Sequence, residues 1–179
     1  LYTPARILDR PLLISSAIEV TEHKVIEREL LKHAHIDKLT GLPDRALIQE
    51  QVNAIIGADE GRLRFALAFI DLDNFKYIND YYSHAIGDAL LVRIAQRMTN
   101  RLRPSDMLAR ISGDEFAVVT PAGPVQAYAL ACRLVTVLAE PIVLPGATVH
   151  LTASVGLTDL SGGHSIDDVL RRASLAVHR

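Results

Sequence analysis

The fold is decided by the stretch Met107-Leu-Ala-Arg-Ile-Ser-Gly-Asp-Glu-Phe-Ala-Val-Val-Thr120, which predicts two strands joined by a tight acidic turn. Residues 107–111 and 116–120 are mainly apolar, and they flank a short polar turn, as in a β-hairpin. Asp114 and Glu115 directly follow Gly113 in this turn. Turns are generally rich in Asp and Gly, so this acidic pair alone indicates only a turn.

A second acidic pair follows another predicted strand. Residues 64–70 form an apolar run typical of a buried strand, and Asp71 comes directly after it. Asp73 would share a face with Asp71 if the strand continued. Three or four carboxylates brought together cannot all stay ionised without a cation, and hard oxygen ligands suit Mg²⁺ or Mn²⁺. The two acidic pairs together therefore predict a metal site.

Helices and further strands alternate along the rest of the chain. Asp44 is expected to cap a helix that Gly57 closes, and Ser165 to cap the last helix. Because hairpins occur together with interleaved helices, the pattern predicts an α+β fold with helices packed on a mixed, mainly antiparallel sheet. The remaining expected helices cover 87–102 and 125–139, and the remaining expected strands cover 142–144 and 148–157.

Composition narrows the function classes. The net charge of −2 gives no basic excess for binding DNA or RNA. No apolar run approaches membrane-spanning length, so we expect no membrane contact within this stretch of chain. The single cysteine, Cys132, allows no internal disulfide and fits a reducing cytoplasm. We expect Cys132 to lie on the apolar face of a helix, in the core.

The first 36 residues have a separate pattern. Residues 12–20 predict one strand, and Thr21 then opens a helix with an apolar stripe on a charged background. Such a helix either pairs with its own copy or folds back on the domain, and the sequence favours neither.

Polar residues crowd the segment 74–88, which predicts a loop, a helix and a second loop. Asn79 and Asp88 have the donors and acceptors that can read a guanine edge. Lys76 and the backbone amides near Phe75 can hold a phosphate. Gly87-Asp88 is also an ordinary helix start, and taken alone that simpler interpretation is preferred.

Several motifs in order resemble the GGDEF domains, the diguanylate cyclases. They are Asp71-Leu-Asp-Asn-Phe-Lys-Tyr-Ile-Asn-Asp, His84-Ala-Ile-Gly-Asp88 and Arg110-Ile-Ser-Gly-Asp-Glu-Phe116, with further matches at 37–45, 152–156 and 170–176. The resemblance implies a palm-like (ferredoxin-like) α+β domain at 37–179, cut short at its C-terminus. It also suggests a linker signalling helix at 21–36, the end of a PAS-like sensor at 1–20, and an EAL phosphodiesterase domain beyond the chain.

The resemblance also implies an activity. Two subunits, held as a homodimer through the linker helix, would condense two GTP into cyclic di-GMP and release pyrophosphate with Mg²⁺ or Mn²⁺. The alternative is a catalytically weak or inactive domain that binds GTP or cyclic di-GMP and regulates an adjacent EAL domain.

Roles follow for individual residues, still as implications of the resemblance. The expected metal ligands are Asp71, the Leu72 carbonyl, Asp114 and Glu115. The expected catalytic residues are Asp114, which accepts the hydroxyl proton, Glu115 and Lys76. The expected GTP-binding residues are Phe75, Asn79, His84, Asp88, Ser112 and Gly113. Asp37 and Arg45 are expected to form an ion pair that transmits orientation.

A second binding site is expected ahead of the hairpin. Arg103-Pro-Ser-Asp106 matches the spacing of the family's product-inhibition site, where Arg103 grips phosphate or guanine and Asp106 accepts from guanine. The same segment is also a helix end followed by a proline turn. Ser112 and Ser83 stand where the family usually has Gly, and Ser174 stands where it usually has Asp.

Overall fold

The computed structural model describes residues 35–58, 64–160 and 166–177. The chain divides into two compact units, Leu1–His35 and Ile36–Arg179, and the fold described here is that of the second. The strand expected at 12–20, the helix opened by Thr21 and the cap expected at Ser165 lie outside the described residues. No helix of the described part of the chain is long and apolar enough to cross a membrane.

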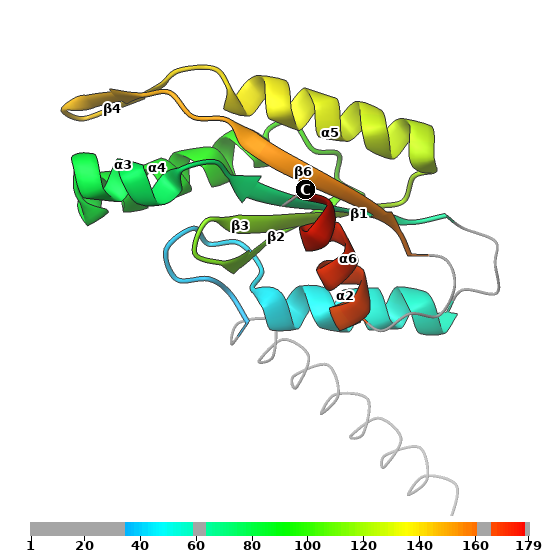
Figure 1. Cartoon of the computed structure of the whole chain (residues 1–179). Helices are drawn as coiled ribbons and strands as arrows, with labels where there is room; N and C mark the ends of the chain where they lie inside the picture. Colours follow the sequence, from blue (N-terminus) through cyan, green and yellow to red (C-terminus); the bar gives the residue numbers. More distant parts are fainter. Residues whose placement is uncertain (1–34, 59–63, 161–165, 178–179) are drawn as a thin grey trace, which may run out of the picture. The chain divides into compact units, whose positions relative to one another are not determined.

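A four-stranded antiparallel sheet forms the centre of this unit (Figure 1). Its spatial order is β2-β3-β1-β6, and every pairing between neighbours is antiparallel. Together with the helices on its two faces, this antiparallel sheet confirms the α+β fold class. The bounds of the strands are Ala66–Leu72 for β1, Met107–Ser112 for β2, Glu115–Thr120 for β3 and Ala153–Asp159 for β6. A separate two-stranded hairpin pairs β4, Ile142–Leu144, with β5, Ala147–Val149.

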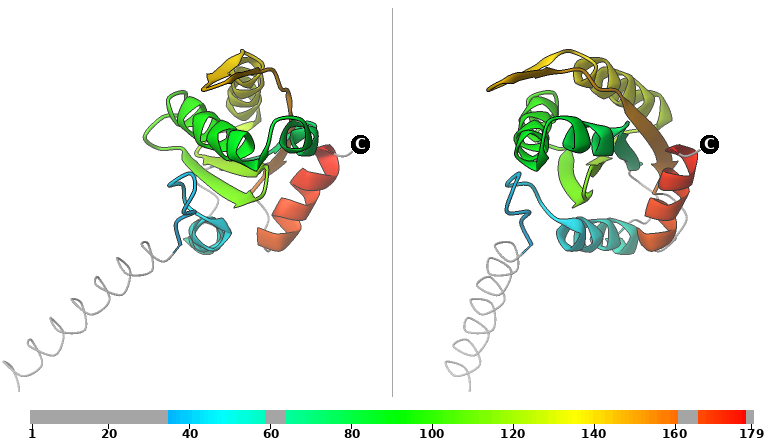
Figure 2. Two further views of the ribbon diagram at one scale, coloured as in Figure 1. Left: turned by 90° about the vertical axis from the view of Figure 1, so that its left-hand side faces the viewer. Right: turned by 60° about the vertical axis from the view of Figure 1, so that its left-hand side comes forward.

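Helices cover both faces of the sheet (Figures 1 and 2). One face carries α2, Arg45–Ala58, and α6, Ile166–Val177. The opposite face carries α4, His84–Thr99, and α5, Pro124–Leu138. The short helix α3, Phe75–Tyr81, follows β1 directly and leads into α4.

The central strand β1 explains why its sequence is a continuous apolar run. Because both faces are covered, side chains pointing either way are buried. Ile70 and Leu72 pack in the cluster that includes residues of α4 and α5, whereas Leu67 and Phe69 pack in the cluster on the α2 and α6 side. Strand β1 thus joins two hydrophobic layers, and its end is fixed from both sides.

Most expected elements are present, with shifted bounds. Asp44 caps α2 as expected, its side chain accepting from the amide of Leu47 at 3.0 Å. Strand β1 runs two residues past the expected end at Ile70, because β3 and β6 both continue pairing with it as far as Asp71. The strand expected at 148–157 is instead two strands, with β5 ending at Val149 and β6 beginning at Ala153.

The position expected for Cys132 is wrong. It is exposed on α5, although the sequence pattern predicted a core position. The buried face of α5 is formed by Ala127, Leu130, Ala131, Leu134, Val137 and Leu138, and Cys132 lies beside this stripe. A helix with 15 residues and many apolar side chains has more such residues than its buried face accommodates.

Gly156 generates a first prediction, because β6 and α6 approach each other closely there. A Cβ atom at this position would lie 2.0 Å from the carbonyl oxygen of Ala173, and packed helix backbone cannot easily move away. We expect Gly156→Ala to lower the free energy of unfolding by about 1–3 kcal/mol, measured by urea denaturation. Gly123→Ala is the matched control, since its Cβ would meet only the flexible Gln126 side chain, at 3.2 Å. Equal losses in both variants would contradict the close approach.

Candidate functional site

The acidic residues predicted from the sequence meet at one end of the sheet. The register of β1 and β3 places Asp71 directly opposite Glu115. The amide of Leu72 donates to the carbonyl oxygen of Asp114 at 3.3 Å, which holds the hairpin turn beside β1. Directly opposed residues have Cβ atoms about 4.5–5.5 Å apart, so the Asp71 and Glu115 side chains are neighbours on one face.

The turn between β2 and β3 assigns different roles to Ser112 and Gly113. Gly113 has φ 41°, in the left-handed region that favours glycine. Ser112 does not have a positive φ, so its backbone accommodates a side chain. Its hydroxyl donates to Oε2 of Glu115. The serine at this position, where glycine is usual, therefore acts through a hydrogen bond to Glu115, an expected metal ligand. It does not change the conformation of the turn.

The donor set fits Mg²⁺ or Mn²⁺ in a particular way. Among the described residues, no three His, Cys, Asp or Glu side chains form a ready metal-binding group. Mg²⁺ commonly takes one or two protein carboxylates and completes its coordination with water and substrate phosphates. Two adjacent carboxylates, Asp71 and Glu115, match that need.

Asp73 makes hydrogen bonds of its own beside this acidic group. It follows the last residue of β1, Leu72, and its amide donates to the carbonyl oxygen of Thr152 at 3.0 Å. Its carboxylate accepts hydrogen bonds from the hydroxyls of Thr152 and Ser154. Thr152 and Ser154 belong to a motif that the sequence resemblance quoted without giving it a role.

Helices α3 and α4 bring the expected guanine-reading residues together. The side chain of Asn79 lies so close to Gly87 that a Cβ atom there would be 1.9 Å from its Oδ1 atom. The ring of Phe75, which is buried, lies near the same point, 3.3 Å from it. Asp88 follows Gly87 and is exposed. The glycine thus allows the Asn79 amide to pack against α4 at the residue before Asp88.

Two further expected residues are exposed at this end of the domain. Lys76 lies in the first turn of α3, and His84 is the first residue of α4. Ser83 is the N-cap of α4, with φ 158° and ψ 164°, and its hydroxyl oxygen accepts from the Ile86 amide at 3.4 Å. A serine at this position therefore supplies a helix cap that glycine does not.

Arg103 and Asp106 lie in the turn before β2, at the opposite end of this strand from Ser112. The two carboxylate oxygens of Asp106 accept from the Arg103 amide at 2.9 Å and from the Thr120 hydroxyl at 2.7 Å. Asp106 therefore stabilises a turn, as the simpler interpretation of this segment predicted. The Arg103 side chain is exposed.

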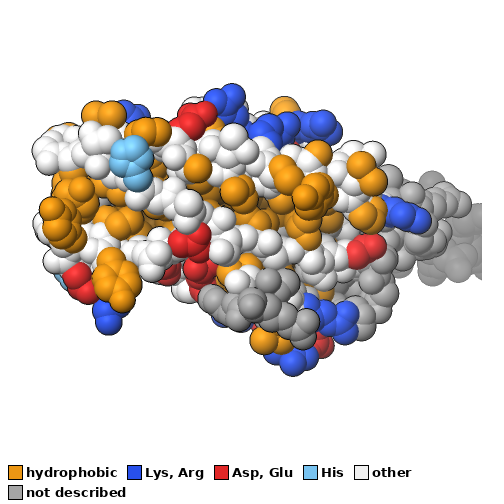
Figure 3. Space-filling model, turned by 45° about the horizontal axis from the view of Figure 1, so that its top comes forward, with side chains coloured by type: hydrophobic (Ala, Val, Ile, Leu, Met, Phe, Trp, Pro, Cys, Tyr) orange, Lys and Arg blue, Asp and Glu red, His pale blue; other side chains and the backbone are white. Residues whose placement is uncertain are grey.

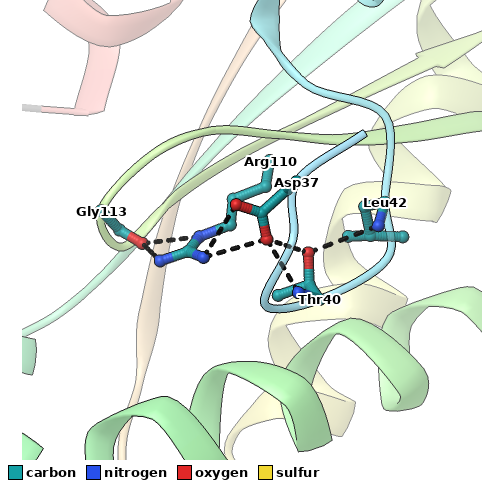
Figure 4. Close-up of polar contacts among 5 residues, drawn as sticks. All are labelled: Asp37, Thr40, Leu42, Arg110 and Gly113. Carbon is teal, nitrogen blue, oxygen red and sulfur yellow. Dashed lines mark hydrogen bonds and ion pairs between the residues drawn. The ribbon is translucent and has the colours of Figure 1, made fainter. Parts of the chain in front are cut away.

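Arg110 is a residue whose role the sequence did not indicate (Figure 4). Its Nε and Nη2 atoms donate to the carbonyl oxygen of Gly113 at 3.0 and 2.7 Å. Its Nη1 atom contacts both carboxylate oxygens of Asp37, at 3.0 and 3.2 Å. One guanidinium thus joins the acidic turn to the segment that precedes α2. The available signal was a lone cation in an apolar strand immediately before the turn.

The expected Asp37–Arg45 ion pair is therefore wrong. Arg45 pairs with Asp167 at the start of α6, at 3.1 Å, where both side chains are largely exposed. Asp37 also accepts from the amide and hydroxyl of Thr40, at 2.8 and 2.6 Å, and this closes its own turn. Asp37 is thus held between Thr40 and Arg110.

Burial alone would raise the pKa of Asp37. The Thr40 hydroxyl and amide and the Arg110 guanidinium together outweigh burial and hold the pKa of this carboxyl below its ordinary value. The ion pair with Arg110 is only partly exposed, with 12% and 24% of the Arg110 and Asp37 side chains accessible.

Two of the grooves in the described part of the chain lie at opposite ends of β1. One, of about 590 Å³, lies between α3 and the segment before β6, and its lining includes Asp73, Asn74 and Thr152 as well as Tyr77, Tyr81, Tyr82 and His150. The other, of about 500 Å³, is lined mainly by apolar residues near the start of α5. Figure 3, which views the face carrying α5, shows exposed hydrophobic side chains in several patches.

Comparison with known proteins places this geometry in a family. The family described as "Diguanylate cyclase, GGDEF domain" matches residues 34–179. The bifunctional diguanylate cyclase/cyclic di-GMP phosphodiesterase MucR of Pseudomonas aeruginosa is 35% identical over 175 residues, which cover 96% of this chain and 26% of MucR. The diguanylate cyclase TpbB of Pseudomonas aeruginosa is 42% identical over 132 residues, covering 72% of this chain and 30% of TpbB.

A solved structure agrees with these relatives. The crystal structure of a sensory box/GGDEF family protein from Caulobacter crescentus is similar with a TM-score of 0.75 and 36% identity, covering 81% of this chain and 96% of that one. The chain spans less than a third of the length of MucR or TpbB.

The Asp37–Arg110 contact generates a second prediction. A lowered pKa in the folded state means that ionised Asp37 stabilises the fold above its unfolded pKa of about 3.9. At pH 7 we expect Asp37→Asn to lower the free energy of unfolding by about 1–3 kcal/mol. The difference from wild type should shrink as pH falls below about 4, when the wild-type carboxyl is protonated.

Denaturant titrations from pH 7 to pH 3 measure this difference. Asp167→Asn is the control, because its ion pair is exposed and should contribute about 0.5 kcal/mol or less. A difference for Asp37→Asn that stays constant across this pH range would contradict the assignment.

Proposed function

The chain belongs to the GGDEF family of diguanylate cyclases, and from this premise we propose that its domain condenses two GTP molecules into cyclic di-GMP and releases two pyrophosphates. The observation that carries the proposal is the strand register that sets Asp71 opposite Glu115, with Asp114 held beside β1. The pairing of Asn79 with Gly87 across α3 and α4 supports it.

Guanine recognition is assigned to the α3–α4 pair. The Asn79 amide offers a donor and an acceptor, and the Asp88 carboxylate accepts from ring and exocyclic N–H groups. Phe75 packs beneath them, where it limits the depth to which the base can enter. His84, exposed at the start of α4, lies at the edge of this surface.

The acidic end of the sheet is assigned to the phosphates. Asp71, Glu115 and the Leu72 carbonyl would hold Mg²⁺ or Mn²⁺, which supplies charge neutralisation for phosphate oxygens when bound. Asp114 is assigned to accept the proton of the attacking 3′-hydroxyl. Lys76, together with the turn at Ser112 and Gly113, is assigned to the phosphate groups.

The chemistry requires two copies of the domain. Each 3′-hydroxyl forms a bond to the α-phosphorus of the other GTP, and the bond to that nucleotide's pyrophosphate breaks. We therefore propose a homodimer with the two acidic ends facing, held through residues 21–36. Because GTP is an intracellular nucleotide, the same proposal places the domain in the cytoplasm.

Product binding is assigned to the turn before β2. The exposed Arg103 guanidinium suits a phosphate or guanine of cyclic di-GMP. Asp106 holds that turn through the Arg103 amide and has lone pairs left for a guanine N–H. Product binding at this turn would also affect the sheet, because Asp106 accepts a hydrogen bond from Thr120 at the end of β3.

One observation favours a second function. The Ser112 hydroxyl occupies an oxygen of Glu115, an expected metal ligand. A domain weakened in this way would bind GTP or cyclic di-GMP and regulate an adjacent EAL phosphodiesterase domain. An assay of cyclic di-GMP formation separates the two functions.

The third prediction concerns turnover. With GTP and Mg²⁺ the chain is expected to form cyclic di-GMP. Asp114→Asn is expected to reduce the rate of cyclic di-GMP formation at least about 100-fold. Chromatography of the reaction mixture measures this rate. Glu50→Gln, at an exposed position on α2, is the control and should retain the rate. Absence of product from a dimeric, GTP-bound sample would reject the cyclase. Product from Ser112→Gly but not from wild type would favour the regulatory function.

The fourth prediction concerns guanine recognition. Gly87→Ala puts a methyl group where Asn79 now lies, so the amide must leave its position. We expect the affinity for a non-hydrolysable GTP analogue to fall at least about tenfold, measured by calorimetry, as for loss of one or more polar contacts. Gly123→Ala should leave the affinity unchanged. Unaltered affinity in a folded Gly87→Ala protein would show that Asn79 does not read the base.

A further inference from the structure

We infer that Asp73, Thr152 and Ser154 form a clasp that positions the loop between β1 and α3 for the nucleotide. The nucleotide in this inference rests on the proposed function, whereas the contacts are hydrogen bonds of the structure. The inference gives a role to the Thr152-x-Ser154 pair and to Asp73. Asp73 is a positioning residue, because it acts through the loop that it holds.

The clasp engages both carboxylate oxygens and the amide of Asp73. The Ser154 hydroxyl donates to Oδ1 at 2.8 Å, and the Thr152 hydroxyl donates to Oδ2. The Asp73 amide donates in turn to the Thr152 carbonyl oxygen at 3.0 Å. Three hydrogen bonds thus join one loop residue to β6 and the residue just before it.

The periodicity of β6 explains why both hydroxyls reach the same carboxylate. Thr152 and Ser154 alternate with Leu151 and Ala153, which are buried. Side chains two residues apart in an extended chain point to the same side. Ser154 is also the register partner of Asp71, so the clasp borders the acidic group directly.

The loop that the clasp holds has an unfavourable backbone conformation. Asn74, the residue after Asp73, has φ 60° and ψ 25°, in the left-handed region. Asparagine tolerates this region better than most residues, but the surroundings must still maintain the conformation. The Asn74 carbonyl then accepts from the Tyr77 amide at 2.9 Å, which starts α3. The clasp therefore fixes the point from which α3 departs.

This placement connects the two halves of the proposed site. On one side of Asp73 lie Asp71 and the Leu72 carbonyl, and on the other lie Lys76 and Asn79 on α3. Their separation is set by the two-residue connection between β1 and α3, which Asp73 anchors. Two hydroxyl donors suit this role, because they satisfy a carboxylate without adding a second positive charge beside a cation site.

The experiment removes the hydroxyls one at a time in the full chain. Thr152→Val and Ser154→Ala are expected to speed amide hydrogen exchange in residues 72–77 without nucleotide. Each is also expected to weaken binding of a non-hydrolysable GTP analogue about tenfold, with KM rising more than kcat falls. Thr152→Ser, which keeps the hydroxyl, should restore exchange and affinity to within about twofold of wild type.

Thr158→Val is the matched control. Thr158 lies on the same face of β6, and its hydroxyl makes only a 3.5 Å contact with the carbonyl of Asp159. This variant should change neither exchange in 72–77 nor affinity. The unfolding midpoint of every variant is measured in parallel, so that loss of affinity through global destabilisation is recognised.

Two results would overturn the inference. One is unchanged exchange in residues 72–77 of folded Thr152→Val and Ser154→Ala proteins. The other is faster exchange there with full affinity for the nucleotide, which would show that the loop needs no positioning. A wild-type chain that binds the analogue but forms no product defeats the proposed turnover alone, since exchange and affinity in the variants still decide on the clasp.

Discussion

The contact of the Arg110 guanidinium with the Gly113 carbonyl is the interaction on which the acidic end of the sheet depends. A carbonyl in a two-residue turn has few backbone partners, and here it receives two N–H groups from one side chain. The same guanidinium is held in place by Asp37, which Thr40 orients in turn. The conformation of the turn that carries the acids is therefore determined by a segment more than seventy residues earlier in the chain.

The site as a whole is assembled from backbone geometry first and side chains second. Antiparallel pairing sets Asp71 against Glu115, and a glycine lets two helices approach until Asn79 meets Gly87. Both arrangements follow from strand pairing and helix packing. The polar groups are therefore preorganised, which lowers the cost of ordering them when a nucleotide binds. The loop at Asp73 connects the two arrangements.

Sequence patterns predicted the elements well where burial controls them. The apolar runs of β1, β2 and β3 and the cap at Asp44 follow from local chemistry. The patterns did not predict contacts between distant segments. Asp37 was expected to pair across a short turn with Arg45. It pairs instead with Arg110, whose amide also donates to the Pro43 carbonyl oxygen at 2.9 Å and so ties β2 to this segment. Likewise, nothing in the order of residues indicated that Thr152 and Ser154 would hydrogen-bond to Asp73 beside the acidic group. The roles given to the site residues stay predictions.

Ser112 and Gly113 of the acidic turn have different backbone conformations, and this difference decides which substitutions each position tolerates. The left-handed backbone falls on Gly113, so any side chain there adds strain, whatever its chemistry. Ser112 has an ordinary backbone and an exposed side chain, so substitutions there alter hydrogen bonding while the turn keeps its shape. Ser112 is thus a position where evolution can adjust the strength of the site while the fold is kept. Gly113 permits no comparable adjustment.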